Sequence, residues 1–273
     1  MAQQDPLVLA SDGLPARAVG PWVHEKKSYL ERYLSVVVKA VGRKWHGKLA
    51  YLDLFSGPGR SVVRDNGEEV EGSPLVAISC DFSKYVFVDR PEVLAALRQR
   101  VAATGKTSRA VFIEGDCNDV VDEIRGSYAA DHLAVVFIDP TGLQIRFETV
   151  RKLVENRKMD LLMTVQLGMG ITMNLQQYAK SNGDALTAFL GNTSWRRDVQ
   201  LGGSPSQVTR RMMNRYIEQL GKLGFETARQ MPVRTHQNNL LLYFVVFASR
   251  HPRGLDLWDK ITQIEPSGQR GLF

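Results

Sequence analysis

The chain has 273 residues, of which 44% are hydrophobic, so it is long and apolar enough for one large core. Charged residues make up 23% of it, a share typical of globular proteins and unlike that of disordered or fibrous chains. Its 35 basic and 29 acidic side chains leave a net charge of +6. A positive excess of this size is compatible with nucleic acid as a partner but does not require one.

The two cysteines, Cys80 and Cys117, do not form a C-x-x-C pair. The five histidines show neither H-x-H nor H-x-x-x-H spacing. Disulfide frameworks and zinc sites need such groups at close, regular spacing. We therefore expect no disulfide framework and no bound metal.

No segment of the sequence indicates export or a membrane span. The first residues lack a basic start followed by an apolar run, so we expect no signal peptide. The most apolar stretch, 240–248, is far shorter than the roughly 20 residues that cross a bilayer. We expect a cytoplasmic protein without membrane contact.

Residues 1–48 read as an N-terminal arm followed by a helix. The segment up to Gly20 is polar and broken by proline and glycine, which predicts an extended arm. From 22 to 41 apolar residues recur at helical spacing, which predicts a long amphipathic helix.

Residues 49–167 alternate between short apolar runs and helical patterns. This alternation is typical of βαβ units that build a buried parallel sheet. The predicted strands are 49–55, 85–89, 110–114, 133–139 and 161–165. The predicted helices between them are 91–103, 118–125 and 147–155.

Residues 168–273 change in texture and complete the same domain. Helical patterns cover 175–190 and 206–223, and a last helix is predicted at 255–264. Two further strands, 227–234 and 240–249, are separated by a loop short enough for a hairpin. The whole predicts a Rossmann-like α/β fold: five parallel strands closed by an antiparallel hairpin, with an N-terminal helix.

The first candidate site follows the first predicted strand, in the run Asp53-Leu-Phe-Ser56-Gly57-Pro-Gly59. Glycines at the carboxyl end of a parallel strand let a ligand approach the backbone. A plain tight turn is the alternative interpretation. A nicotinamide fingerprint fits less well, because Val62 stands where its third glycine belongs.

Acidic residues end or follow the second and third predicted strands. Asp89 can accept both hydroxyls of a ribose, since a carboxylate has two acceptor oxygens. Asp116 can meet an adenine amino group, cap the next helix, or do both. Its neighbour Cys117 reads more readily as a small buried residue than as a nucleophile.

The fourth predicted strand ends in Asp139-Pro140-Thr141-Gly142. A carboxylate there can accept a hydrogen bond from a substrate amino group and orient its lone pair. An Asp-Pro turn is the simpler alternative. Elsewhere, Ser73-Pro74 predicts a helix N-cap and first helical position.

Taken together, these motifs resemble the three-Cys-motif partner protein family (TcmP), and the resemblance covers nearly the whole chain. The matching segments are DGLPARAVGPW, YLDLFSGPGR, EGSPL, VFVD, GDCND, FIDPTGL, QLGMG and VFASRHPRGLDLW. The resemblance implies a class I methyltransferase-like fold and a three-cysteine-motif protein as partner. With two cysteines, this chain corresponds to the partner and not to the cysteine protein.

The motifs are also similar to those of the bacterial enzyme that methylates adenine N6 in large-subunit ribosomal RNA. This likeness implies S-adenosylmethionine (SAM) as cofactor and a lysine, Lys26 or Lys27, at its carboxylate. The catalytic pair would be Asp139 and Pro140. The residues implied to bind the cofactor are Lys26, Asp53, Ser56, Gly57, Gly59, Asp89, Asp116 and Cys117.

One departure divides the functional hypotheses. Amino-methyltransferases carry a second proline and an aromatic residue that stacks on a flipped base, where this chain has Thr141 and Gly142. Phe147 or the loop 167–171 could supply the aromatic wall that the missing residue would form.

The first hypothesis is a SAM-dependent methyltransferase acting on an amino group of DNA or RNA, held by the basic groups at 43–48 and 196–215. The second is an altered SAM-binding partner module, and the third a nicotinamide or nucleotide-sugar enzyme.

Overall fold

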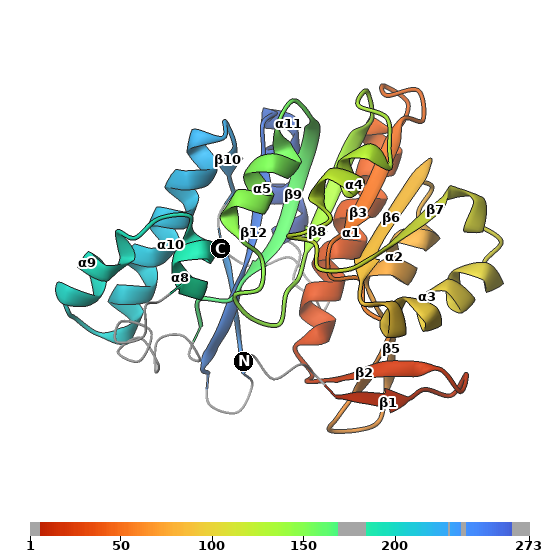
Figure 1. Ribbon diagram of the computed structural model, residues 1–273, viewed down its shortest axis with the longest axis horizontal. Helices are drawn as coiled ribbons and strands as arrows, with labels where there is room; N and C mark the ends of the chain where they lie inside the picture. Colours follow the sequence, from red (N-terminus) through yellow and green to blue (C-terminus); the bar gives the residue numbers. More distant parts are fainter. Residues whose placement is uncertain (1–5, 169–183, 229, 236–238, 264–273) are drawn as a thin grey trace.

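The computed structural model describes residues 6–168, 184–228, 230–235 and 239–263. Its centre is an eight-stranded sheet in the order β10-β12-β9-β8-β3-β6-β7, with β11 also paired to β12 (Figure 1). The strands are β3 (Leu49–Asp53), β6 (Lys84–Asp89), β7 (Ala110–Glu114), β8 (Leu133–Ile138), β9 (Lys158–Val165), β10 (Glu226–Thr227), β11 (Met231–Arg234) and β12 (Leu241–Ser249).

Five of these strands run parallel, which confirms the predicted fold class. β3 lies in the middle, between β6 and β8, so Asp53 is level with Phe87 and Phe137. The outer parallel pairs are β6 with β7 and β8 with β9. Because their carboxyl ends share one edge, residues that follow different strands meet there.

The closing hairpin differs in detail from the prediction. Its first strand is split into β10 and β11, and both pair with β12. β12 is antiparallel to β9 and therefore lies inside the sheet. The predicted loop between the hairpin strands lies partly outside the described residues.

Two helical layers cover the sheet because successive strand residues point to opposite faces. Leu49 and Tyr51 pack with one layer, and Ala50 and Leu52 pack with the other. The first layer holds α1 (Val23–Val41), α2 (Ser73–Ser79), α3 (Pro91–Ala103) and α11 (Pro252–Thr262). The second holds α4 (Val121–Gly126), α5 (Phe147–Val154), α8 (Asp184–Leu190), α9 (Trp195–Gln200) and α10 (Pro205–Lys222).

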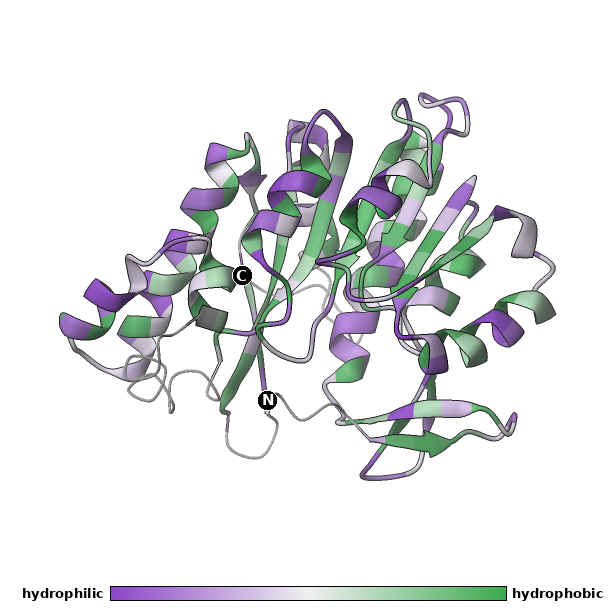
Figure 2. Cartoon of the chain, viewed as in Figure 1, coloured by the Kyte–Doolittle hydropathy of each residue, from purple (hydrophilic) through white to green (hydrophobic). Residues whose placement is uncertain are grey.

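The colouring by hydropathy follows this layering: the central strands are mostly apolar, and polar colours lie on the outer turns of the helices (Figure 2). No described helix is both long and apolar enough to cross a membrane. The predicted helices agree with the observed ones to within a few residues. Of the predicted helix 175–190, only the part from 184 onward lies in the described residues.

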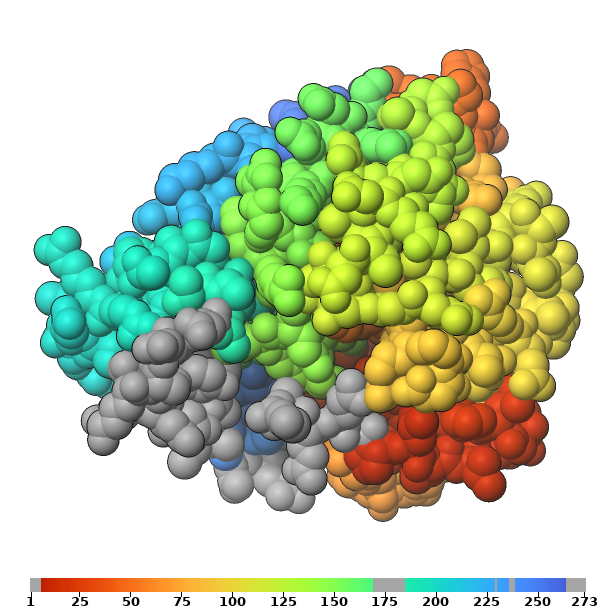
Figure 3. Space-filling model, in the orientation of Figure 1, coloured from red at the N-terminus to blue at the C-terminus, as the bar shows by residue number. Residues whose placement is uncertain are grey.

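A second, four-stranded sheet was not predicted. The supposed arm forms β1 (Leu7–Leu9) and β2 (Pro15–Val19), which join β4 (Arg60–Val63) and β5 (Glu69–Glu71) in the order β1-β2-β4-β5. β4 follows directly after Gly59, so the glycine-rich loop leads straight into this sheet. The N-terminal strands lie against the carboxyl edge of the central sheet, beside the α3 region (Figure 3).

Candidate active site

A cavity of about 280 Å³ opens at the carboxyl edge of the parallel strands. Its walls come from the glycine-rich loop, the first turns of α1, the segment after β8 and the start of β12. Among the predicted site residues, its lining includes Lys26, Ser56, Gly57, Gly59, Asp139 and Pro140. These residues are far apart in sequence, and the parallel topology brings them together.

Asp53 lies behind the lining and has no exposed surface. It accepts hydrogen bonds from the Tyr51 hydroxyl at 3.0 Å and from the Phe55 backbone N–H at 3.3 Å. Burial raises its pKa to about 7, although hydrogen bonds from Ser73, Tyr51 and Phe55 act in the opposite direction. Asp53 therefore supports the glycine-rich loop from beneath.

Ser73 was predicted to be an N-cap, and this is wrong. Gly72 is the N-cap of α2: its carbonyl accepts the first helical hydrogen bonds from Leu75 and Val76. The Ser73 hydroxyl instead donates to Asp53, and Ser73 lines the cavity. The sequence contains one indication of this N-cap, because Gly72 precedes Ser73 and glycine is also found at N-cap positions.

The glycines of the loop are required by conformation and by space. Gly57 and Gly59 have φ angles of +65° and +90°, which disfavour any side chain. A Cβ on Gly59 would lie 2.9 Å from Leu97, and one on Gly72 would lie 3.1 Å from the Gly59 backbone. The loop and the start of α2 thus approach one another more closely than side chains allow.

Asp89 lies outside the lining of the cavity and holds this loop from the next strand. Its Oδ2 accepts from the Gly57 backbone N–H and from Arg17, each at 2.8 Å, and its Oδ1 accepts from the Arg90 backbone N–H. Arg17 comes from β2 and also lines the cavity. Sequence reasoning missed Arg17, because 72 positions separate it from its partner and no local pattern links them.

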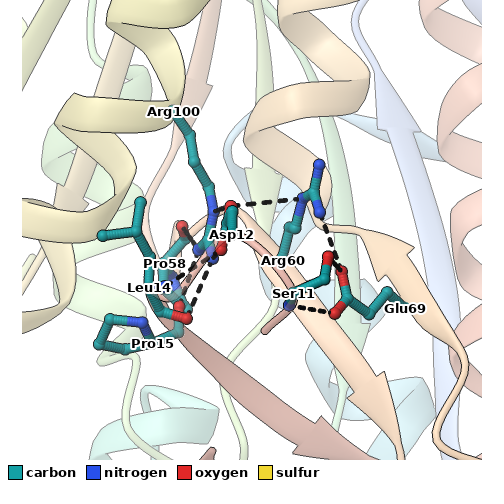
Figure 4. Close-up of polar contacts among 8 residues, drawn as sticks. All are labelled: Ser11, Asp12, Leu14, Pro15, Pro58, Arg60, Glu69 and Arg100. Atoms are coloured by element: carbon teal, nitrogen blue, oxygen red, sulfur yellow. Dashed lines mark hydrogen bonds and ion pairs between the residues drawn. The ribbon is translucent and has the colours of Figure 1, made fainter. Parts of the chain in front are cut away.

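A buried arginine ties the N-terminal sheet to the same loop (Figure 4). Arg100 of α3 donates to both carboxylate oxygens of Asp12 at 2.8 Å, and to the carbonyls of Pro15 and Pro58. Its side chain is 4% exposed. The hydrogen bonds from Arg100 lower the pKa of Asp12 to about 2.

The acceptor atoms of the Asp139-Pro140 motif have partners from within the chain. Lys26 forms an ion pair with Asp139, and the Thr164 hydroxyl donates to its other oxygen at 2.8 Å. The Pro140 carbonyl accepts from Gln166 Nε2 at 2.9 Å. The two residues predicted for cofactor and catalysis, Lys26 and Asp139, therefore contact each other.

Asp116 and Cys117 lie outside the lining of the cavity. Asp116 is exposed, and its carboxylate accepts from the backbone and side-chain amides of Asn118 in the turn before α4. It is not the N-cap of that helix, whose N-cap is Val120. Cys117 is 2% exposed, and burial raises the pKa of its thiol, as expected for a packed residue.

The aromatic wall proposed for the missing stacking residue is absent at Phe147, which packs against Tyr216 in the core. Residues 169–171 of the loop 167–171 lie outside the described residues. The aromatic side chains that do line the cavity are Trp22, Phe55, Phe137 and Tyr243. Among the described residues, no group of three or more acidic, histidine or cysteine side chains could hold a metal ion.

The predicted basic groups differ in position and in pairing. Arg43 and Lys44 are exposed and lie just before β3, at the opposite edge of the sheet from the cavity. Arg215 is paired with the buried Asp198, and Arg211 donates to backbone carbonyls. The exposed members near the carboxyl edge are Arg197 and Arg210.

No family model and no curated protein matches the sequence. Among solved structures, the chain is similar to a Legionella pneumophila protein of family model DUF519, with 10% identity, a TM-score of 0.56, and 92% of this chain and 95% of that chain covered.

Two further structures resemble it less. One is M. jannaschii TYW2 in complex with AdoMet, with 11% identity and a TM-score of 0.44; the match covers 90% of this chain and 85% of that chain. The other is the O-methyltransferase TomG from Streptomyces achromogenes in complex with SAM, with 9% identity and a TM-score of 0.44; the match covers 81% of this chain and 79% of that chain. At 10% identity the likeness to the Legionella protein is one of fold alone.

Proposed function

We propose that the cavity binds SAM and that the chain is a SAM-dependent methyltransferase acting on an amino group of a nucleic-acid base. The observation that carries this proposal is the convergence of Gly57, Gly59, Lys26 and Asp139 around one cavity at the carboxyl edge of the sheet. In open α/β sheets this edge is the usual place for a nucleotide-like ligand.

The residues present fit the cofactor. Glycines with positive φ leave backbone room for a ligand, and Lys26 and Asp139 offer one positive and one negative group. The positive group matches the carboxylate of the methionine part of SAM, and the negative group is left for the amino group of the acceptor. Asp89, which already accepts from Gly57, can receive a ribose hydroxyl if Arg17 moves away.

SAM, when bound, supplies a methyl group on a positively charged sulfur. The part of this chain is to hold and orient the acceptor. Asp139 is the carboxylate at the acceptor end, held by Thr164 and Lys26. It would accept a hydrogen bond from the substrate amino group and favour the lone pair that points toward the methyl group.

A second function has one observation in its favour. The acceptor atoms of Asp139 and Pro140 are already bonded to Lys26, Thr164 and Gln166. This pattern favours a SAM-binding module that does not itself transfer a methyl group and that works with a three-cysteine-motif protein, as the resemblance to the TcmP family implies. Under this alternative the two proteins co-purify and the chain alone shows no turnover.

The binding test is a calorimetric titration of the purified chain with SAM and S-adenosylhomocysteine. We expect binding by the wild type and at least a roughly tenfold weaker affinity in Asp89→Ala, because a hydrogen bond to a charged group is removed. Asp122→Asn, an exposed carboxylate on α4, is the matched control and should bind as the wild type does. A folded wild type that binds neither ligand contradicts the proposal.

The transfer test follows with SAM labelled in its methyl group and total RNA and DNA as acceptors. Label that appears in a base with the wild type and Asp122→Asn, but not with Asp139→Ala, is the expected result. Binding of SAM without transfer to any nucleic acid, in the presence and absence of the three-cysteine protein, would favour the partner module.

A further inference from the structure

Tyr243, at the start of β12, places a buried polar group in the cavity wall that the proposed function has not used. Its side chain is almost fully buried, with 4% of the residue exposed, and it lines the cavity. Its hydroxyl has no hydrogen-bond partner among the described residues. A buried hydroxyl without a partner carries a desolvation cost that a ligand can relieve.

The surroundings of this hydroxyl select what kind of atom it can meet. Burial, and next the negative charges of Asp139 and Glu25, raise the pKa of Tyr243, so the hydroxyl stays protonated and can donate. The Lys26 ammonium lies 5.9 Å from the centre of the Tyr243 ring. Two donors, one of them charged, therefore border the same part of the cavity.

Lys26 can serve two anions at once. An ammonium has three N–H groups, and the ion pair with Asp139 needs one of them. A carboxylate has two oxygens, so it can accept from Lys26 and from Tyr243 together. Among the functional groups of SAM the carboxylate is the only anion.

We propose that the Tyr243 hydroxyl, together with Lys26, binds the carboxylate of the methionine part of SAM. This inference rests on the proposed cofactor and adds a residue that the motifs did not indicate. Tyr243 is a binding residue here, and its hydroxyl places the amino-acid end of the cofactor against β12.

The experiment compares wild type and Tyr243→Phe in calorimetric titrations with SAM and with decarboxylated SAM, which keeps the sulfonium and lacks the carboxylate. We expect Tyr243→Phe to bind SAM roughly tenfold more weakly than the wild type does. For decarboxylated SAM we expect the two proteins to have the same affinity. The matched control is Tyr128→Phe, which removes another buried hydroxyl without a partner among the described residues, away from the cavity.

The outcomes separate the two proposals. A wild type that binds neither compound defeats the cofactor proposal itself. A wild type that binds SAM, with Tyr243→Phe unaffected or weakened equally for both compounds, overturns only the carboxylate contact. Urea unfolding checks that both variants are folded. Because neither hydroxyl has a partner within the described part of the chain, neither substitution should lower the unfolding midpoint.

Discussion

Asp53 is a fully buried carboxylate beneath the glycine-rich loop, and its ionisation affects the stability of the fold. Burial raises its pKa from 3.8 to about 7, so the folded chain binds this proton more tightly than the unfolded chain does. Ionisation of Asp53 therefore lowers the free energy of unfolding. This loss is absent below pH 3.8, grows as pH rises and is complete above about pH 7. The charged carboxylate is a cost that the folded loop carries at neutral pH.

Asp53→Asn is expected to remove this cost. The gain in unfolding free energy over the wild type should be near zero at low pH and increase through the window between the two pKa values. The raised pKa of Asp53 corresponds to a gain in unfolding free energy of at most about 4 kcal/mol at pH 8. Urea unfolding across this pH range measures it, and Asp122→Asn should run parallel to the wild type. A difference that does not change with pH contradicts the assignment.

The candidate site was predictable where one short motif carries several residues. Gly57, Gly59 and Asp139 follow parallel strands, and strand topology alone brings such residues to one edge. Arg17 and Tyr243 were not predictable, because their place in the cavity depends on β2 and β12, far away in sequence. Single residues in those strands have no local signature of a ligand site.

At the scale of elements, α3 is a bridge between the N-terminal sheet and the glycine-rich loop. Arg100 makes that bridge with its hydrogen bonds to Asp12, Pro15 and Pro58. A neighbouring pair, in which Arg60 and Ser11 both contact Glu69, links β4 and the N-terminal turn (Figure 4). Arg100 thus attaches the small sheet to α3 and the glycine-rich loop, and Glu69 holds the strands of the small sheet to one another.

Arg100→Met should destabilise the chain by roughly 3 kcal/mol, because it removes the main ion-pair partner of Asp12 and leaves the Pro15 and Pro58 carbonyls without their donor. Hydrogen exchange should become faster in β1 and β2, which Arg100 fastens to the loop. Arg98→Met is the matched control on the same helix: its side chain is 45% exposed and its ion pair with Glu114 should be worth less than about 1 kcal/mol. Equal effects of the two substitutions would show that the bridge does not matter.

Helices were predicted well because their apolar periodicity is long, whereas the small sheet was missed for a physical reason. β2 buries Ala16 and Ala18, which are small and rarely favour strands. The start of α10 was placed at Ser206, although Ser204 is the N-cap and forms a capping box with Gln207. Here the signal existed in Ser-Pro-Ser-Gln and identifies the true start.

At the scale of the whole molecule, the net positive charge is spread over both edges of the sheet. Arg197 and Arg210 belong to α9 and the first half of α10, which begins at the carboxyl edge and runs back toward β10. Arg43 and Lys44 lie at the other edge. Under the proposal that a nucleic-acid base enters the cavity, we expect the first pair, and not the second, to contact its phosphates.

Under the nucleic-acid proposal, changing Arg197 and Arg210 to Gln together should weaken binding of a labelled single-stranded oligonucleotide. The slope of log affinity against log salt should fall by about 1.4, at roughly 0.7 for each phosphate that is no longer neutralised. Changing Arg43 and Lys44 to Gln alters the net charge by the same amount and should leave the slope unchanged. Equal slopes for both double variants would argue against this docking side.

The position of β12 has a consequence for how the chain is made. Protein synthesis proceeds from the N-terminus, so β9 leaves the ribosome long before β12, its neighbour in the sheet. Until Leu241–Ser249 has emerged, one edge of β9 has no strand beside it, and β9 itself is rich in apolar residues such as Leu161 and Met163. An uncovered apolar edge invites pairing with other chains. Nascent or prematurely terminated products of this sequence should therefore depend on chaperones far more than the finished protein does.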